Sequence, residues 1–190
     1  MSTEASQPLL RVKGRLMSAS EIERTLVRLA HQIVEKTAAS DGVVLVGIKR
    51  RGIPLAERLA ALIGGIEKRP IQTGVLDIRF YRDDLSTHDV RPVVNAADLG
   101  VEVTGRDVIL CDDVLYTGRT IRAALDALFD HGRPRRVQLA VLIDRGHREL
   151  PIKADFVGKN VPTAHGERIA LMLTESGAKE DEVVLVKKKI

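Results

Sequence analysis

Two adjacent aspartates, Asp112 and Asp113, end an apolar run and precede a Thr-Gly-Arg-Thr turn in the stretch VILCDDVLYTGRT. Neighbouring carboxylates repel each other, so such a pair is kept most easily where a ligand supplies hydrogen-bond donors or a metal supplies positive charge. A vicinal diol offers two hydroxyl donors, one for each acid. The alternative is a plain strand end at which one aspartate caps the next helix.

The turn after the acids has the composition of a phosphate-binding turn. Gly118 lets the backbone approach a ligand closely, and Thr117 and Thr120 add hydroxyl groups where a helix begins with free N–H groups. A phosphate dianion fits such a turn, so the stretch matches both ends of a ribose 5-phosphate. The turn is neither a Walker A loop nor a G-x-G-x-x-G dinucleotide fingerprint, because neither spacing is present.

A second group of charged residues, Lys49, Arg50 and Arg51, stands between two glycines in the stretch GIKRRGIP. Taken alone, three cations in a loop often lie in a turn exposed to solvent and bind no ligand. Beside a sugar-phosphate site they suit a polyanionic leaving group, because positive charge stabilises the negative charge that develops as the group departs. Pyrophosphate fits this requirement, and Mg2+ would share in neutralising it.

The elements that must position these residues alternate between strands and helices. Helical spacing of apolar residues predicts helices over residues 20–37 and 54–64, and a third that ends at Gly132. Apolar, β-branched runs predict strands at residues 43–48, 73–81, 107–113 and 136–144. The alternation predicts an α/β fold with a parallel sheet. Ligands of such sheets bind beyond the carboxyl ends of the strands, and the residues that fall there are Gly47, Asp112 and Asp144.

Composition indicates a globular protein of a reducing compartment. The 190 residues suit one domain with appendages, and no apolar run approaches the roughly 18 residues of a membrane span. The N-terminal residues do not resemble a secretory signal, so we expect a cytoplasmic protein. The only cysteine, Cys111, is expected in the core. The net charge is +4, and residues 131–159 hold seven lysines and arginines against three acids, which favours an anionic partner.

Several motifs resemble those of one enzyme family. The acid pair with VLYTGRT resembles the phosphoribosyl pyrophosphate (PRPP) signature of type I phosphoribosyltransferases. Three further stretches resemble, more narrowly, the PyrR family of bacterial pyrimidine-operon attenuation regulators, which also have uracil phosphoribosyltransferase activity. They are DIRFYRDDL, DALFDHGRPRRVQLAVLIDRGHRELPI and ADFVGKNVPT, and the resemblance covers about residues 15 to 175.

The resemblance implies an α/β fold of the type I phosphoribosyltransferase kind, with a central, mostly parallel sheet flanked by helices, a small hood and a flexible active-site loop. It implies a flexible N-terminal extension over residues 1–14 and a single domain over residues 15–190. The flexible loop would cover residues 83–98, and the hood region residues 144–163. The loop would close over the site and exclude water, and its matched residues are Tyr81, Arg82, Asp83 and Asp84.

The same resemblance implies how PRPP is held. Asp112 and Asp113 would engage the ribose hydroxyls, directly or through Mg2+ with or without an intervening water. Arg50 and Arg51 would face pyrophosphate and complete the expected catalytic set. The whole signature would bind PRPP, and its residues are Val108, Ile109, Leu110, Cys111, Asp112, Asp113, Val114, Leu115, Tyr116, Thr117, Gly118, Arg119 and Thr120.

The resemblance also implies the base and the reaction. Uracil would lie under the hood, near Phe156, Val157 and Lys159, with backbone groups contacting its edge. Its N1 would displace pyrophosphate from the anomeric carbon of PRPP and give UMP. The transition state would have oxocarbenium character, which acids near the ribose stabilise.

The second activity of the family is binding of a stem-loop in the leader mRNA, favoured by UMP or UTP, so that transcription terminates. Arg24, Arg28 and His31 lie on one helix face by their spacing, which is also typical of a solvated face. Only 3% of the residues are aromatic, which disfavours stacking on single strands. The family implies a homodimer or homotetramer, with no membrane and no DNA partner. The matched RNA-binding residues are Arg28, His31, Arg148, Lys153 and Lys159.

The chain departs from the family pattern at four positions. Val27 and Arg50 each stand where a threonine is common, and Arg79 and Phe80 replace a small polar and an aliphatic residue. Three hypotheses remain: a bifunctional enzyme and RNA regulator, an enzyme alone that could prefer another base such as a purine, and a regulator alone that senses nucleotides. The acid pair and YTGRT disfavour the third, because sensing UMP does not require a pyrophosphate site.

Overall fold

The computed structural model describes residues 10–38, 42–82 and 98–188, and the chain divides into two compact units. The larger unit comprises residues 24–162, and the smaller one joins residues 1–23 to residues 163–190. Most of the expected flexible loop, residues 83–97, lies outside the described residues, as do residues 1–9 of the expected extension.

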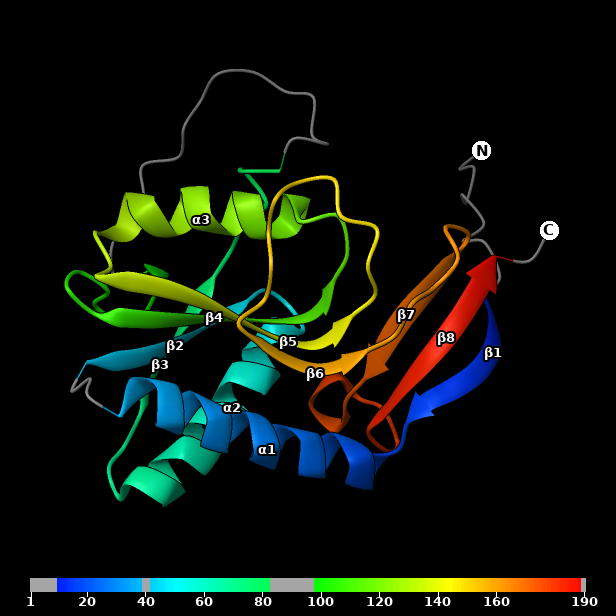
Figure 1. The fold of residues 1–190 in the computed structure, drawn as a ribbon, viewed down its shortest axis with the longest axis horizontal. Coiled ribbons are helices and arrows are strands. Elements are labelled where there is room, and N and C mark those ends of the chain that lie inside the picture. The colour runs from blue at the N-terminus through cyan, green and yellow to red at the C-terminus, as the bar shows by residue number, and fades with distance from the viewer. Residues whose placement is uncertain (1–9, 39–41, 83–97, 189–190) are drawn as a thin grey trace, which may run out of the picture. The chain divides into compact units, whose positions relative to one another are not determined.

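A five-stranded parallel sheet forms the centre of the larger unit, in the order β3-β2-β4-β5-β6 (Figure 1). Helix α3 (Arg119–His131) covers one face of this sheet, and α2 (Gly52–Glu67) covers the other together with α1 (Ala19–Thr37) from residue 24 onward. The predicted parallel α/β fold is therefore confirmed. The strands are β2 (Val43–Ile48), β3 (Gln72–Leu76), β4 (Asp107–Leu115), β5 (Arg136–Asp144) and β6 (Phe156–Asn160).

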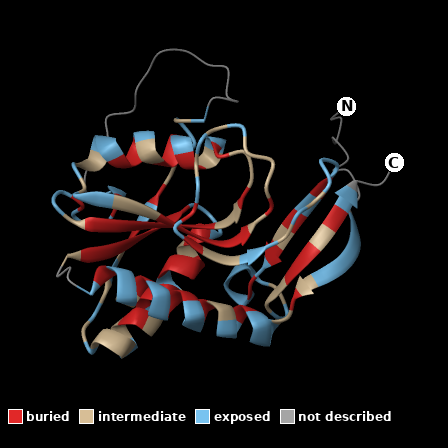
Figure 2. Ribbon diagram, viewed as in Figure 1, coloured by how far each residue is buried: buried red, intermediate tan, exposed pale blue. Residues whose placement is uncertain are grey.

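Both faces of the sheet are buried, which explains why its central strands are continuous apolar runs. All six residues of β2 and the first six of β4 are buried (Figure 2). Val44, Val46 and Leu110 belong to one core cluster with Ile121 and Leu128 of α3. Full burial of one such aliphatic side chain stabilises the fold by roughly 1.5–3 kcal/mol. The core thereby fixes the strand ends and the charged residues that follow them.

The first helix begins one residue before its predicted start. Its capping box consists of Ser18 and Glu21, two residues earlier than the Ser20 and Glu23 pattern suggested by the sequence. Ser18 N–H donates to the Glu21 carboxylate at 2.8 Å, and Glu21 N–H donates to Ser18 Oγ at 3.4 Å. Both bonds satisfy donors that have no partner inside the first turn.

Two predicted segments differ from the structure. The strand predicted for residues 73–81 ends at Leu76, and the chain then turns, because Tyr81 N–H bonds the carbonyl of Ile78 at 3.0 Å. The expected hood, residues 144–163, lies within the larger unit except for residue 163. Its residues Phe156–Asn160 pair with β5 as the edge strand β6. They belong to the main sheet because strand pairing satisfies their backbone and the Phe156 ring is buried.

The smaller unit is built on an antiparallel sheet in the order β1-β8-β7. Residues 10–14 of the expected extension belong to β1, because their backbone pairs with β8. In this unit Lys13 Nζ and Glu167 Oε1 form an ion pair at 2.5 Å. No described helix is long and apolar enough to cross a bilayer. The elements are β1 (Leu10–Met17), β7 (Glu167–Met172), the short 3-10 helix η2 (Thr174–Ser176) and β8 (Glu182–Lys188).

Candidate functional site

The strand order brings the two predicted groups of charged residues together. Strand β2 lies between β3 and β4 in the sheet. The chain passes from β2 outward to β3 on one side and from β4 outward to β5 on the other, so the two connections leave β2 and β4 in opposite directions. Such a switch point leaves a crevice beyond the carboxyl ends of the strands, where ligands of parallel sheets bind. Lys49 follows β2, and Asp112 lies near the end of β4, with Gly47 and Cys111 paired between the two strands.

The two aspartates lie in different surroundings. Asp112 is 7% exposed and accepts a hydrogen bond from Asp113 N–H at 2.9 Å. The more exposed Asp113 accepts one from Val114 N–H at 2.9 Å. Burial, and after it the charge of Asp113, raise the pKa of Asp112 well above its usual value, although Arg51 opposes the shift. A cation or a hydroxyl donor at this position would therefore stabilise the ionised carboxylate.

The first four residues of the predicted PRPP-binding signature, Val108 to Cys111, serve the core. Each is at most 1% exposed inside β4, which leaves no surface for a ligand. Burial, reinforced by the charge of Asp112, raises the pKa of the Cys111 thiol, so the thiol stays protonated. The structure contradicts the prediction that these four side chains contact PRPP, because the sheet encloses them. They position the two acids instead.

The cation loop, residues 49–51, folds against the end of β4. Nη1 of Arg51 lies 3.6 Å from Oδ2 of Asp113, and the peptide bond after Lys49 is cis. A Cβ atom at Gly52 would overlap the carbonyl oxygen of Cys111, so only glycine allows the first turn of α2 to approach β4 this closely. Arg51 of the cation loop and Asp113 of β4 thus form an ion pair.

A network that the sequence did not predict extends this group of cations. Asp77, just after β3, accepts hydrogen bonds from Nε of Arg79 at 3.0 and 2.9 Å and from Nζ of Lys49 at 3.2 Å. Desolvation acts to raise the pKa of Asp77, but the hydrogen bonds from Arg79 and Lys49 outweigh it and lower that pKa. Asp77 therefore orients two cations at the ends of neighbouring strands. The only signal in the sequence was that Arg79 departs from the family pattern.

These residues line a cavity of about 440 Å³. The three acids Asp77, Asp112 and Asp113 form part of its wall. Cations outnumber acids in this wall, and such an excess of positive charge favours binding of a polyanion such as pyrophosphate. The cations of the wall are Lys49, Arg50, Arg51, Arg79 and Arg82.

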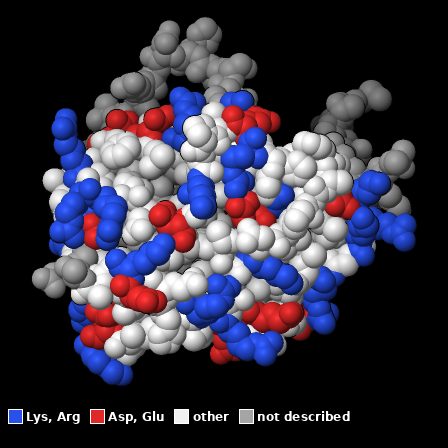
Figure 3. Space-filling view, viewed as in Figure 1, with Lys and Arg blue, Asp and Glu red and all other residues white. Residues whose placement is uncertain are grey.

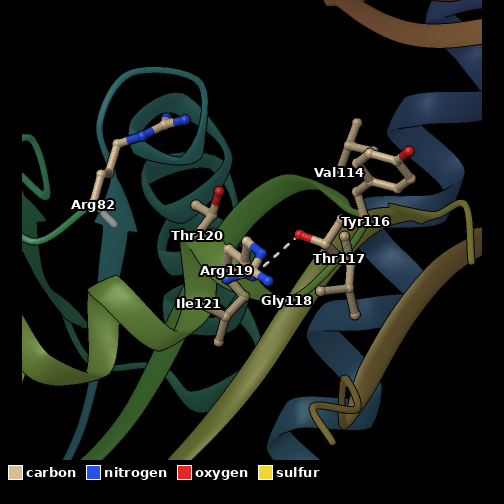
Figure 4. A pocket seen from close by; sticks show the side chains of 9 residues that line it. Arg82, Val114, Tyr116, Thr117, Gly118, Arg119, Thr120 and Ile121 are labelled. Carbon is tan, nitrogen blue, oxygen red and sulfur yellow. Dashed lines mark hydrogen bonds between the residues drawn. The ribbon is translucent and has the colours of Figure 1, made fainter. Parts of the chain in front are cut away.

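The turn predicted to bind phosphate, residues 116–120 and called the phosphate loop below, lines a second cavity of about 250 Å³ (Figure 4). Gly118 has a φ of 95°, a left-handed conformation that favours glycine, and α3 begins immediately after it. Arg119 N–H donates to Thr117 Oγ1 at 3.3 Å, as the dashed line in Figure 4 marks. Arg82 and Thr120 line both cavities, so the two adjoin.

The flexible-loop residues fall partly within the described structure. Tyr81 donates its hydroxyl proton to Oδ2 of Asp130 at 2.7 Å, which ties the start of the loop to the end of α3. Arg82 follows and contributes to both cavities. Figure 4 shows it at the smaller one. Asp83 and Asp84 lie outside the described residues.

The acid pair fits a magnesium ion that arrives with a phosphate-bearing substrate. Magnesium is usually held by one or two carboxylates together with waters and substrate phosphates. Asp112 and Asp113 supply two carboxylates, and the raised pKa of Asp112 marks a buried charge that a cation would stabilise. Within the described ranges, no cluster of three or more His, Cys, Asp or Glu side chains could hold a metal by itself.

Among the described residues that line the two cavities, none is a predicted uracil-binding residue. Phe156 is 1% exposed, and Nζ of Lys36 lies 4.9 Å from the centre of its ring. A contact between this ring and a base does not fit the structure, because the ring is enclosed. Val157 is partly buried against the core, and Lys159 is exposed at the end of β6.

The predicted RNA-binding residues separate into two kinds. Arg28, His31, Lys153 and Lys159 are exposed, whereas Arg148 is partly buried. Arg28, on α1, donates to the carbonyl of Gly158 at 2.5 Å, and the Arg148 guanidinium is turned inward by three hydrogen bonds. Arg148 therefore differs from the expected free surface cation. On the face shown in Figure 3, basic and acidic side chains are interspersed.

Comparison with known proteins identifies the family of this chain. The phosphoribosyl transferase domain family matches residues 15–168. Proteins named Bifunctional protein PyrR from Roseiflexus sp. (strain RS-1) and Pelotomaculum thermopropionicum are 58% and 53% identical to this chain. The two alignments cover 91% and 93% of this chain and 94% and 98% of those relatives.

Solved structures share the fold at low sequence identity. A hypoxanthine-guanine phosphoribosyltransferase from Bacillus anthracis is 20% identical, with a TM-score of 0.71 over 94% of this chain and 99% of that one. The hypoxanthine phosphoribosyltransferase of Trypanosoma cruzi is 17% identical, with a TM-score of 0.70 over 94% and 98% of the two chains.

Proposed function

This chain belongs to the phosphoribosyltransferase family and, within it, to the PyrR family, and from that premise we propose that it has two activities. The first transfers ribose 5-phosphate from PRPP to uracil and gives UMP and pyrophosphate. The second is binding of a stem-loop in the leader mRNA of a pyrimidine operon, favoured by uridine nucleotides, which terminates transcription. One observation carries the enzymatic proposal: the acid pair lies between the phosphate loop and the cation loop at the strand switch.

The sugar-phosphate half of PRPP occupies the smaller cavity and its border. The phosphate loop receives the 5-phosphate, because glycine, two threonine hydroxyls and the start of α3 meet there. Asp112 and Asp113 accept hydrogen bonds from the ribose hydroxyls. The pair lines the larger cavity next to Val114, which lines both cavities, and this position supports the assignment.

The pyrophosphate half occupies the larger cavity. Arg50 and Arg51 face it, and Lys49 and Arg79 extend the positive wall. When bound, Mg2+ would neutralise part of the pyrophosphate charge, with Asp112 and Asp113 as its protein ligands, directly or through water. Positive charge along the wall favours the leaving group more as its negative charge develops, so these side chains lower the barrier as well as bind the substrate.

The reaction exchanges one bond at the anomeric carbon. The bond from this carbon to pyrophosphate breaks, the bond to N1 of uracil forms, and the N1 proton is released. Positive charge builds on the ribose in between, and the carboxylates beside it are placed to stabilise that charge. The segment from Tyr81 onward excludes water, which would otherwise hydrolyse PRPP.

Uracil binds beside β6, with backbone groups at Val157 and Lys159 contacting its edge. The burial of the Phe156 ring supports a role for this residue in fixing the strand rather than in stacking on the base. For RNA, the exposed His31, Lys153 and Lys159 are the side chains best placed to meet phosphates. The assembly proposed from the family is a homodimer or homotetramer.

Two assays test the proposal. The first measures UMP formation from uracil and PRPP with Mg2+, beside hypoxanthine as the competing base; turnover with hypoxanthine and none with uracil would overturn the assigned substrate. The second titrates the protein into its leader hairpin at fixed salt, with and without UMP, beside a scrambled hairpin. Salt is fixed because phosphate contacts make the affinity depend steeply on ionic strength.

A phosphoribosyltransferase without RNA regulation is the second candidate. It is favoured by the hydrogen bonds that Arg28 and Arg148 make within the chain, because they occupy donors that would otherwise contact RNA. Weak binding that is equal for the two hairpins and indifferent to UMP would select this candidate.

A further inference from the structure

We propose that Arg148 is a positioning residue for the phosphate loop, acting on the bound sugar phosphate through the backbone of Tyr116 and Thr117. The inference rests on the proposed function, because it assigns the phosphate loop to the 5-phosphate of PRPP. Arg148 is not part of the cavity lining formed by the described residues, so it does not act by touching the phosphate.

The Arg148 guanidinium connects three separate pieces of chain. Nη1 donates to the carbonyl of Tyr116 at 2.7 Å, Nη2 to Oδ2 of Asp144 at 2.6 Å, and Nε to the carbonyl of Ile152 at 2.9 Å. The side chain is 24% exposed. Three acceptors in different directions require the planar, multi-donor guanidinium, and a lysine ammonium could not reach all of them.

The residues after Arg148 hold the next part of the phosphate loop. The N–H groups of Glu149 and Leu150 both donate to the carbonyl of Thr117, at 2.9 and 3.2 Å. Nε of Arg119 bonds the Glu149 carboxylate at 2.7 Å. A Cβ atom at Gly118 would lie only 3.3 Å from the Ile152 side chain, so this segment packs directly on the glycine. Residues 148–152 therefore form one side of the phosphate loop.

These contacts determine where the loop can offer hydrogen-bond donors. In a trans peptide the C=O and the following N–H point in opposite directions. Fixing the carbonyls of Tyr116 and Thr117 toward residues 148–152 therefore turns the N–H groups of Thr117 and Gly118 to the other side of the loop. Preorganised N–H groups bind an anion without the cost of ordering them at the moment of binding.

Ribose 5-phosphate binding measured by calorimetry tests this role without any turnover. We expect Arg148→Ala to weaken the affinity by roughly tenfold or more, as loss of charge-assisted hydrogen bonds to a partly buried loop does. Arg148→Lys should restore little, because one ammonium cannot satisfy three acceptors. Arg133→Ala removes an exposed arginine of the same unit and should leave the affinity unchanged.

Steady-state kinetics separate positioning from general damage. For Arg148→Ala the KM for PRPP should rise about tenfold while the KM for uracil changes less than about twofold. Guanidinium ion at a non-denaturing concentration should recover part of the PRPP affinity in this variant and not in Arg133→Ala. An equal rise in both KM values without such recovery would overturn the proposal.

The same variants distinguish the proposal from the proposed function. If the unaltered protein makes no UMP from uracil and PRPP, the proposed function fails, but ribose 5-phosphate binding still reports on Arg148. If Arg148→Ala loses affinity for the leader hairpin and keeps full affinity for ribose 5-phosphate, the positioning role is overturned in favour of a direct RNA contact.

Discussion

Arg51 and Asp113 connect the two strands that form the site, with Nη1 of Arg51 3.6 Å from Oδ2 of Asp113. Arg51 comes from the loop after β2 and Asp113 from the end of β4, so the ion pair spans the strand switch. The Arg51 side chain is 50% exposed, and a pair of this kind contributes roughly 0–1 kcal/mol to stability. The main effect of the ion pair is on position. It holds Arg51, proposed to face the leaving pyrophosphate, beside Asp113, proposed to bind the ribose.

Replacing both acids, Asp112→Asn with Asp113→Asn, should lower UMP formation by about 100-fold or more, because the carboxylates that stabilise the developing positive charge are lost. The melting temperature should stay level or rise, because the raised pKa of Asp112 marks an ionised group that the fold disfavours. Activity and thermal melting are measured side by side. Asp126→Asn, in an exposed pair on α3, is the control. Unchanged turnover in the double variant would contradict the assigned roles.

Arg79→Ser should raise the KM for PRPP and weaken product inhibition by pyrophosphate by roughly threefold to tenfold. This expected change is smaller than the full loss of a charge-assisted hydrogen bond, because solvent screens the charge of an Arg79 side chain that is 71% exposed. Initial rates at varied PRPP and pyrophosphate measure both effects. Phe80→Ser alters the exposed neighbour and should change neither constant. A response of Phe80→Ser equal to that of Arg79→Ser would assign the effect to the segment and not to the charge.

Asp77→Asn should change how stability depends on pH. Because hydrogen bonds from Arg79 and Lys49 lower the pKa of folded Asp77 below the usual 3.8, its contribution to stability is present above that value and is lost as the pH falls through the folded pKa. The difference in melting temperature between the parent and Asp77→Asn should therefore be largest near neutral pH and vanish in strong acid. Thermal melts from about pH 2 to pH 7 measure it. A difference that stays constant over this range would exclude the ion network as its cause.

Val27→Thr should strengthen binding of the leader hairpin by about fivefold, equivalent to about 1 kcal/mol for one restored hydrogen bond. Val27 is 38% exposed on α1, one residue before Arg28, so a hydroxyl there is accessible. The titration is performed at fixed salt with UMP present, and Val27→Ala serves as the control for lost bulk. Equal gains with threonine and alanine would attribute the effect to size.

Gly52→Ala should destabilise the fold by about 1–3 kcal/mol, because the added Cβ would overlap the carbonyl of Cys111 and force α2 away from β4. Gly65→Ala is a matched control in the same helix, where a Cβ meets nothing within 4 Å. Replacing that glycine should stabilise the helix by about 0.5–1 kcal/mol. Urea denaturation compares the two, and destabilisation of equal size at both positions would contradict the close approach at Gly52.

The sequence by itself determined the central strands and the identity of the acid pair. Strands β2 and β5 occupy their predicted ranges because a strand buried on both faces has to be a continuous apolar run. The acids and the phosphate loop follow one another along the chain, so their spacing was visible without knowledge of the fold. The cation loop was visible in the same way, as three charges between two glycines.

Tertiary structure alone decided which residues distant in the sequence lie at this site and which lie away from it. The orientation of Arg79 by Asp77, the place of Arg82 in both cavities and the inward turn of Arg148 all depend on contacts between separate strands and loops. The edge strand β6 and the β1-β8-β7 sheet likewise depend on pairing with residues far away in the sequence. The physical reason is that an exposed arginine and an internally bonded one have the same local sequence pattern. Only the acceptors that folding brings near the guanidinium distinguish the two.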